Sequence, residues 1–313
     1  MLISYLLFAV GLILIIIGGD YFVDSATWIA RVTKLPEVLI GATIVSLATT
    51  FPETMVSVIS AINNQSAMSV GNAVGSTICN TGLILGLYNL VRPSKISSRI
   101  FNFKGLLLIL YILIFWYLAG ISVIGTWASY MLLFMLVLYV FCDLMIVGYR
   151  RSQTNANHME ILTEPSECIR QAVKFIMGIS MIIYGSHLLV THGVTLAKLW
   201  GVPASVIALT LIALGTSLPE FVTAVASLVK GHAELSIGNI LGANILNITM
   251  VMGLSARFRP LKITGQMFYF DIPTSIVINS VLILPSIITK KITRFQSLLL
   301  LVIYAVYVAI LFH

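Results

Sequence analysis

Long apolar stretches follow one another along nearly the whole chain, and short segments rich in polar and charged residues separate them. A helix needs about 20 apolar residues to cross the hydrocarbon core of a bilayer. The pattern therefore predicts an all-α, polytopic membrane protein with ten transmembrane helices. The predicted spans cover about residues 2–30, 37–62, 67–91, 103–121, 124–149, 167–199, 205–230, 235–256, 267–289 and 293–312.

The composition supports lipid as the main solvent of the chain. Of its 313 residues, 59% are hydrophobic and 9% are charged, whereas soluble domains carry about 25% charged residues. The first apolar stretch has no basic segment before it and leads directly into further spans, so we expect it to be a membrane helix and not a cleaved signal peptide. We expect a plasma (inner) membrane protein.

The basic residues give an orientation. Although the net charge is +7, the basic side chains are spread over loops, so nucleic acid is not an expected partner. The positive-inside rule favours an extracellular N-terminus. The extracellular loops then contain only Lys198, Arg257, Arg259 and Lys262 of the basic residues. The cytoplasmic set is Arg31, Lys34, Arg92, Lys95, Arg99, Lys104, Arg150, Arg151, Arg170, Lys174, Lys230, Lys290, Lys291 and Arg294.

The chain contains an internal repeat. When Pro52-Glu53 is set over Pro219-Glu220, the same constant offset matches many further residues without a gap. The matches include Thr43 with Thr210, Thr49 with Thr216, Gly71-Asn72 with Gly238-Asn239, Asn80 with Asn247, and Gly86-Leu87 with Gly253-Leu254. Each copy contains five predicted spans, an odd number, so the two copies must enter the membrane in opposite directions. We therefore predict inverted repeats at 1–149 and 167–313, joined by a cytoplasmic loop at 150–166.

Two glutamates lie deep within apolar spans, one in each copy. A carboxylate at that depth costs at least about 2.5 kcal/mol to insert and usually marks an ion path. No basic residue lies near Glu53 or Glu220 in the sequence, which disfavours a structural ion pair. Two facing carboxylates would suit one divalent cation or two monovalent cations.

A proline precedes each glutamate. Pro52 and Pro219 have no N–H group and clash with the carbonyl four residues earlier, so each helix must break there. Freed carbonyls at bilayer depth are tolerated where they line a cavity or bind a ligand, and hard cations prefer oxygen ligands. Four hydroxyl side chains lie beside the breaks: Thr49, Thr50, Thr216 and Ser217.

The second matching segment of each copy contains two glycines four residues apart, and an asparagine follows them. The glycine spacing of Gly71 and Gly75, and of Gly238 and Gly242, is typical of close helix packing. Asn80 lies on the same helical face as Ser76, and its repeat equivalent is Asn247. We expect this face to line the ion site.

These residues resemble the cation/Ca²⁺ exchanger superfamily, and in particular its prokaryotic sodium/calcium exchanger branch. The segments that resemble its two α-repeats are 41–53 with 71–80, and 208–220 with 238–247. The resemblance implies alternating access by sliding of the first and sixth helices. It also implies that Glu53 and Glu220 hold Ca²⁺ or Na⁺. Its further implied ligands are Thr49 and Thr216, the carbonyls of Ser46 and Ala213, Thr43 and Thr210 on the outer Na⁺ path, and Ser76 with Asn80.

Two positions differ from what many members of the branch carry. Ala243 stands where serine is common, and Asn247 stands where some members have aspartate. The first difference weakens one peripheral Na⁺ site, and the second removes a charge and argues against K⁺ dependence. The stoichiometry of Na⁺ stays open.

The leading hypothesis is a Ca²⁺/Na⁺ antiporter that acts as a monomer without a cofactor. An H⁺/Ca²⁺ antiporter is the first alternative, because a proton can also neutralise a buried glutamate. A cation channel is less favoured, since channels usually have a continuous pore built by symmetric subunits. We expect no enzyme activity, because the sequence has no metal cluster, Ser–His pairing or phosphate loop.

Overall fold

The computed structural model describes residues 2–96, 99–154, 164–200 and 215–311, and most of these residues are helical. Eight helical stretches among them are long and apolar enough to cross a membrane, and one bent pair of helices makes a ninth. A multi-pass helical membrane protein is therefore confirmed. Of the further span predicted at 205–230, residues 215–230 are described, and they contain the helix α11 (Leu218–Lys230).

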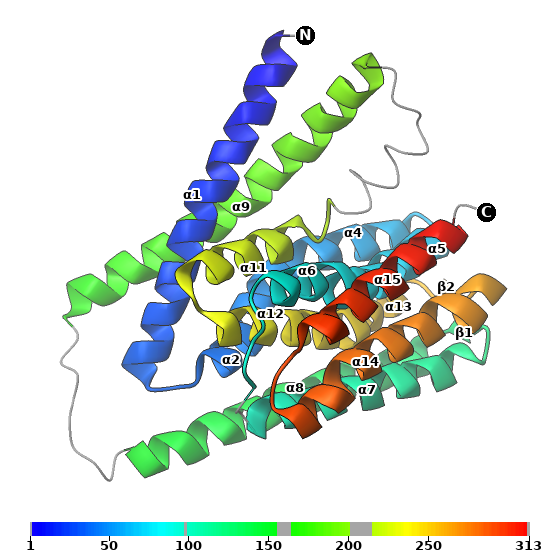
Figure 1. Cartoon of the computed structure of the whole chain (residues 1–313). Coiled ribbons are helices and arrows are strands. Elements are labelled where there is room, and N and C mark those ends of the chain that lie inside the picture. Colours follow the sequence, from blue (N-terminus) through cyan, green and yellow to red (C-terminus); the bar gives the residue numbers. More distant parts are fainter. Residues whose placement is uncertain (1, 97–98, 155–163, 201–214, 312–313) are drawn as a thin grey trace.

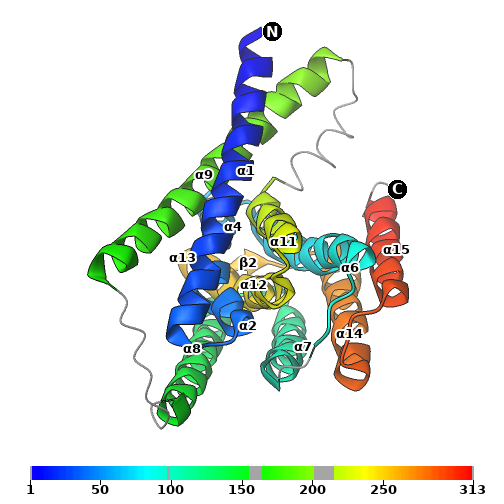
Figure 2. The ribbon, with the colours of Figure 1, turned by 60° about the vertical axis from the view of Figure 1, so that its left-hand side comes forward.

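Helices α1 (Leu2–Thr33) and α9 (Pro165–Leu199) form a pair at one side of the molecule. In Figures 1 and 2 they lie against each other, and one end of each projects away from the other helices. Glycines allow this close approach, because a Cβ added at Gly18 would lie 2.8 Å from the carbonyl oxygen of Gly178. Ion pairs join α1 to α11. Lys230 Nζ of α11 lies 2.6 Å from Oδ1 of Asp20 and 2.6 Å from Oδ1 of Asp24.

The predicted break at Pro52 is confirmed. The helical axis turns by 44° at Thr50, and Pro52 lies in the first turn after the break. The segment before Thr50 includes a π-helix, in which the N–H of Ser46 donates to Gly41, five residues earlier. The elements are α2 (Glu37–Ile40), η1 (Gly41–Val45), α3 (Ser46–Thr49) and α4 (Phe51–Ile62).

Two continuous spans lie deepest in the bundle, and each contains a π-helix that begins at an asparagine. Asn80 opens η2 and its repeat equivalent Asn247 opens η4. π-Helices are rare and frequent at functional sites, so their recurrence at equivalent positions supports a role for this point of the fold. The spans consist of α5 (Ser66–Cys79), η2 (Asn80–Leu85) and α6 (Gly86–Val91), and of α12 (Ala233–Leu246), η4 (Asn247–Val251) and α13 (Met252–Phe258).

The glycine-packing prediction is confirmed in the second copy. α12 packs against α2 and η1, and a Cβ at Gly238 would overlap the carbonyl of Val38. A Cβ at Gly242 would overlap the Ser46 hydroxyl. For Gly71 and Gly75, no described atom lies within 4 Å of an added Cβ, so their packing role stays a prediction.

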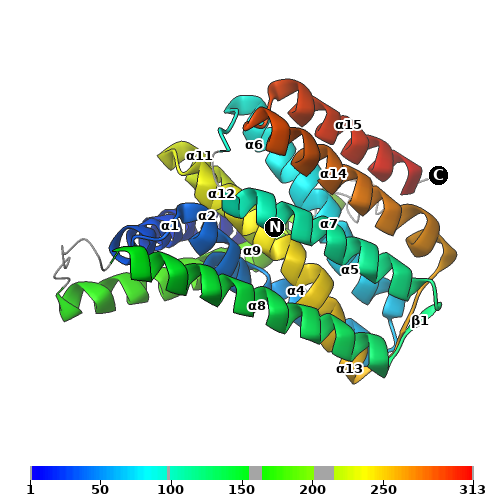
Figure 3. The ribbon, with the colours of Figure 1, turned by 90° about the horizontal axis from the view of Figure 1, so that it is seen from below.

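The remaining helices enclose this centre, as Figure 3 shows from below. They are α7 (Arg99–Ala119), α8 (Thr126–Thr154), η5 (Met267–Asp271), α14 (Ile272–Thr289) and α15 (Arg294–Leu311). Two short strands depart from the all-α prediction: β1 (Val123–Ile124) pairs antiparallel with β2 (Leu261–Lys262). Each strand lies in a loop, where pairing satisfies backbone groups that no helix satisfies.

The assignment of Lys104 to the cytoplasmic loops is wrong. Its side chain is fully buried, and Nζ lies 2.6 Å from Oδ1 of Asp143 on α8. Nζ also donates to the Tyr139 hydroxyl at 3.1 Å, and that hydroxyl donates to the carbonyl of Ala42 in η1. The buried Asp143 supplies the opposite charge that allows an ammonium to leave water.

Replacing Gly238 by alanine should destabilise the protein by about 1–3 kcal/mol, the usual effect of overpacking, because the new Cβ meets the Val38 carbonyl. The measurement is the thermal unfolding midpoint of the purified protein in detergent. Gly148→Ala is the matched control, since it lies in α8 with no atom within 4 Å of an added Cβ. Equal midpoints for the two variants would contradict the packing assignment.

Replacing Lys104 by methionine should lower stability by about 3–5 kcal/mol, because Asp143 is then left as an unpaired buried charge. The double variant Lys104→Met/Asp143→Leu should recover most of the loss, since it removes both charges. Thermal unfolding in detergent compares the two. A double variant less stable than the single one would exclude this ion pair.

Candidate cation-binding site

Two buried carboxylates define the candidate site. Glu53 and Glu220 are both 0% exposed, and none of their four carboxylate oxygens receives a hydrogen bond from the described residues. The two carboxylates interact directly with each other. Neither takes part in an ion pair with a described residue. A group that supplies positive charge would compensate both.

The glutamates occupy the same position in the two copies, directly after a proline in the first turn of a helix. Glu53 lies in the first turn of α4 and Glu220 in that of α11. The N-terminus of a helix carries a partial positive charge, which stabilises a nearby carboxylate. The start of a new helix thus provides free backbone N–H groups and a partial positive charge close to each glutamate carboxylate.

The two copies are interlocked at the site. The η2 segment of the first copy packs against α11 of the second, and η4 packs against α4. Each glutamate helix therefore contacts the asparagine-bearing π-helix of the other copy. Asn80 and Asn247 are 0% and 1% exposed, and the Oδ1 atom of each has no hydrogen-bond donor among the described residues.

Three hydroxyl groups from the predicted set lie around these carboxylates. The Thr50 hydroxyl at the break is buried and has no described partner. Ser217 donates to Ser76 across the two copies at 3.2 Å. The Cys79 thiol, next in sequence to Asn80, lies within electrostatic reach of both glutamates. The Ser217–Ser76 contact joins the segment before the Glu220 helix to α5, the helix that leads to Asn80.

The other first-copy residues of the predicted site lie on the helical segment before the break. Thr49 is buried, lies beside Glu220, and donates to the Ser46 carbonyl at 3.3 Å. The Ser46 carbonyl also accepts the N–H of Thr50 at 2.9 Å. Thr43 is half-buried, and its hydroxyl donates to the Leu39 carbonyl at 2.8 Å. A direct role of Ser46 and Thr43 in binding ions stays a prediction.

The second-copy counterparts are described only in part. Thr216 is half-buried in the turn just before α11, while Thr210 and Ala213 lie outside the described residues. Ala243 is fully buried and brings no side-chain oxygen.

The sequence interpretation missed two asparagines. Asn239 accepts a hydrogen bond from the Thr49 hydroxyl at 3.1 Å. Asn72, its repeat equivalent, donates to the Glu53 carbonyl at 3.2 Å and to Ser57 at 2.9 Å. Each stands next to a glycine of the packing motif, and their recurrence at the constant offset is the signal that indicates a role beside the break.

The donor set suits a hard cation. Carboxylate, amide and hydroxyl oxygens are the ligands that Ca²⁺ prefers, and the two carboxylates supply two negative charges. In the described part of the chain, no group of three or more His, Cys, Asp or Glu side chains is placed to hold a metal ion.

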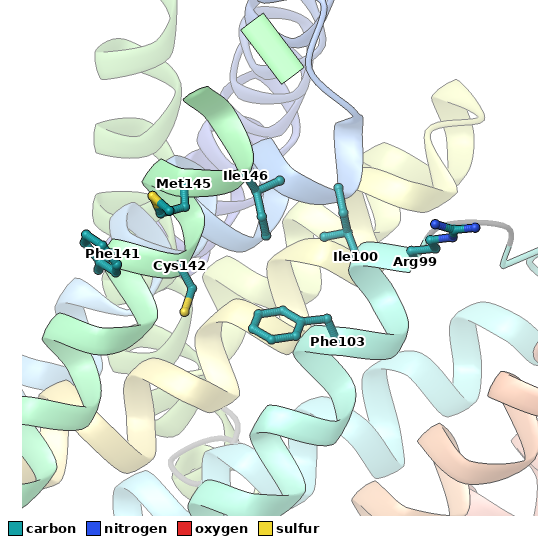
Figure 4. Close-up of a pocket in the computed structure, with 7 residues that line it drawn as sticks. All are labelled: Arg99, Ile100, Phe103, Phe141, Cys142, Met145 and Ile146. Carbon is teal, nitrogen blue, oxygen red and sulfur yellow. The ribbon is translucent and has the colours of Figure 1, made fainter. Parts of the chain in front are cut away.

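An apolar pocket lies elsewhere, between α7 and α8 (Figure 4). It shares no residue with the predicted cation site, and Phe103 and Cys142 point toward one another across it. Its lining residues are Arg99, Ile100, Phe103, Phe141, Cys142, Met145 and Ile146. It carries none of the oxygen ligands that the cation site offers.

Comparison with known proteins agrees with this geometry. The sodium/calcium exchanger protein family model matches residues 3–145 and 171–313. The inner membrane protein YrbG of Escherichia coli is 32% identical over 89% of this chain and 87% of its own length. The sodium/calcium exchanger MaX1 of Methanosarcina acetivorans is 26% identical over 99% of both chains.

The putative antiporter CaxA of Alkalimonas amylolytica is 31% identical over 100% of this chain and 99% of its own. A solved structure of the sodium-calcium exchanger NCX_Mj, soaked with Na⁺ and Sr²⁺, superposes with a TM-score of 0.85 at 26% identity over 98% of each chain. Since the family model covers both halves of the chain, this protein belongs to the sodium/calcium exchanger family.

Proposed function

We propose that this protein is a secondary active antiporter that exchanges Ca²⁺ for Na⁺ across the plasma membrane by alternating access. The observation that carries the proposal is the pair Glu53 and Glu220, buried at equivalent positions without a donor from the described residues. An exchanger requires such a site, because its charge must be compensated by one transported ion or the other. The names of the similar proteins MaX1 and NCX_Mj support the choice of ions.

The proposed ligands belong to the repeated segments of both copies. Glu53 and Glu220 supply the charge, and Asn80 and Asn247 present amide oxygens without a described donor. The full proposed set is Glu53, Glu220, Thr49, Thr216, Asn80, Asn247, Ser76, Thr43, Thr210, Ser46, Ala213, Thr50 and Ser217. All of these ligands come from one chain, which supports a monomer as the functional unit, with no cofactor.

We propose that the chain crosses the membrane ten times as two inverted five-helix repeats, 1–149 and 167–313, with an extracellular N-terminus. Two loop contacts support the alternation. β1 pairs with β2 at one end of the bundle, and Lys95 pairs with Lys291 in an isolated bridge. If the chain crosses ten times with its N-terminus outside, β1 and β2 both lie on the extracellular side. Lys95 and Lys291 then both lie on the cytoplasmic side.

Proton coupling is the second candidate, and the donor-free carboxylates also favour it. A proton on Glu53 or Glu220 would neutralise the buried charge without a metal ion. Both candidates therefore use the same two residues, and they differ in the ion gradient that drives Ca²⁺ movement.

Ca²⁺ uptake into proteoliposomes separates the two candidates. An outward-directed Na⁺ gradient should drive ⁴⁵Ca²⁺ into the vesicles, and the uptake should saturate with Ca²⁺ because one carrier site is occupied per cycle. A pH gradient alone should drive none. Uptake with the pH gradient and none with the Na⁺ gradient would establish the proton-coupled alternative, and single-channel currents would show a channel.

Replacing Glu53 or Glu220 by glutamine should reduce Na⁺-driven Ca²⁺ uptake to the level of protein-free liposomes, because one of the two charges that attract Ca²⁺ is lost. The fold should persist, since neither carboxylate accepts a hydrogen bond from the described residues. Uptake assays with monodisperse purified protein test both points. Glu164→Gln, at an exposed glutamate of the connecting segment, should keep wild-type uptake. Normal rates in either site variant would contradict the assignment.

A further inference from the structure

A chain of buried side-chain amides runs from the proposed site to α14, a helix outside the repeated motifs. Asn80 of η2 contacts Asn244 of α12, which contacts Asn279 of α14. Thr81 bridges Asn244 and Asn279. All four side chains are 0% exposed. A buried polar network of this kind must satisfy its members in one defined arrangement.

The arrangement is fixed by backbone carbonyls, which can only accept hydrogen bonds. Asn279 donates its Nδ2 to the Ser275 carbonyl at 2.8 Å, so its Oδ1 must face the other way. That oxygen accepts the Thr81 hydroxyl at 2.9 Å. The orientation of the Asn279 amide is therefore set by its own helix.

The orientation passes from Asn279 to Asn244. The Nδ2 of Asn244 faces three acceptors: Thr81 Oγ1 at 2.8 Å, Asn279 Oδ1 at 3.3 Å and the Thr77 carbonyl at 3.4 Å. A rotated amide would place its oxygen against the Asn279 oxygen and the Thr77 carbonyl. Asn244 must therefore turn its Oδ1 toward Asn80.

The last step sets the amide of Asn80. Its Nδ2 donates to Asn244 Oδ1 at 3.1 Å, which leaves its own Oδ1 on the other side. This oxygen has no described donor and is fully buried. The relay therefore leaves a buried carbonyl oxygen without a donor on η2, the segment that packs against the Glu220 helix α11.

We propose that Asn244 and Asn279 are positioning residues that hold the Asn80 carbonyl oxygen toward the transported cation and make position 80 specific for an amide. A carboxylate at position 80 has no N–H group to meet the Asn244 oxygen, so two acceptors would face each other. The inference deepens the proposed function and rests on it. It adds two residues, one of them on α14, to the machinery that sets cation affinity.

The relay exists in one copy only. The repeat equivalent of Asn244 is Thr77, and its hydroxyl donates to the Ala73 carbonyl within its own helix at 2.9 Å. Thr77 thus provides a matched control: Thr77→Val also removes a buried hydroxyl next to the site, but it leaves the side chains of the relay in place.

Breaking the relay should weaken Ca²⁺ binding. We expect Asn279→Leu to raise the KM for Ca²⁺ in Na⁺-driven uptake and the equilibrium Kd in detergent about 3- to 10-fold, the range of one net hydrogen bond. The maximal rate per folded protein should change little. Thr81→Val is a milder variant of similar shape and should shift the same constants in the same direction. Thr77→Val should leave both constants at the wild-type value.

Asn80→Asp distinguishes orientation from simple charge. A third carboxylate would tighten Ca²⁺ binding if only charge mattered, whereas the relay predicts a Kd at least as weak as that of Asn279→Leu. Tighter Ca²⁺ binding by Asn80→Asp would overturn the proposal. Unchanged Ca²⁺ constants in both Asn279→Leu and Thr81→Val would overturn it as well.

The failure of the proposed function has a separate signature. If wild-type protein shows no Na⁺-driven Ca²⁺ uptake, the Ca²⁺/Na⁺ assignment fails. Equilibrium binding of Ca²⁺ and of Na⁺, measured on the same variants, then tests the relay independently of transport: a weaker Kd for either ion in Asn279→Leu and Thr81→Val, but not in Thr77→Val, supports it. Equal Kd values for both ions in wild type and all three variants overturn it.

Discussion

The arrangement of this protein depends on keeping two carboxylates without donors inside a lipid-facing bundle. Glu53 and Glu220 are fully buried, and no described residue donates a hydrogen bond to either carboxylate, so two like charges stand together out of water without compensation. Hydrophobic packing cannot compensate for that repulsion. Each glutamate instead lies in the first turn of a helix, whose N-terminus carries partial positive charge, and a bound cation would supply the rest of the compensation.

The broken helix and the π-helices serve the same requirement. A regular helix uses all its carbonyls internally, whereas the break at Thr50 and the π-helices at Asn80 and Asn247 shift hydrogen bonds at the depth of the site. The Lys104–Asp143 pair extends this support outward, because Tyr139 beside it binds the Ala42 carbonyl in η1. This buried ion pair thus helps to position η1, the segment that leads into the break at Thr50.

The sequence predicts the parts of this structure that depend on local chemistry. Pro52 breaks its helix wherever it stands, and a buried Glu53 without a nearby base indicates an ion path, so both could be found from the chain alone. Lys104 could not be placed, because its burial depends on Asp143, 39 positions later, and a span boundary does not reveal such a partner. Asn279 was missed for the same reason, since it gains a role only when α14 packs beside Thr81 and Asn244.

The internal repeat constrains the two halves unequally. Equivalent glutamates and equivalent asparagines are buried in both copies, yet Asn244 and Thr77 differ at equivalent positions and form different hydrogen bonds. Asn279 on α14 of the second copy sets the orientation of the Asn244 amide, and the hydrogen bonds of Thr77 in the first copy include no such partner. A site built this way can keep the symmetry that alternating access needs, while a single amide distinguishes one half from the other.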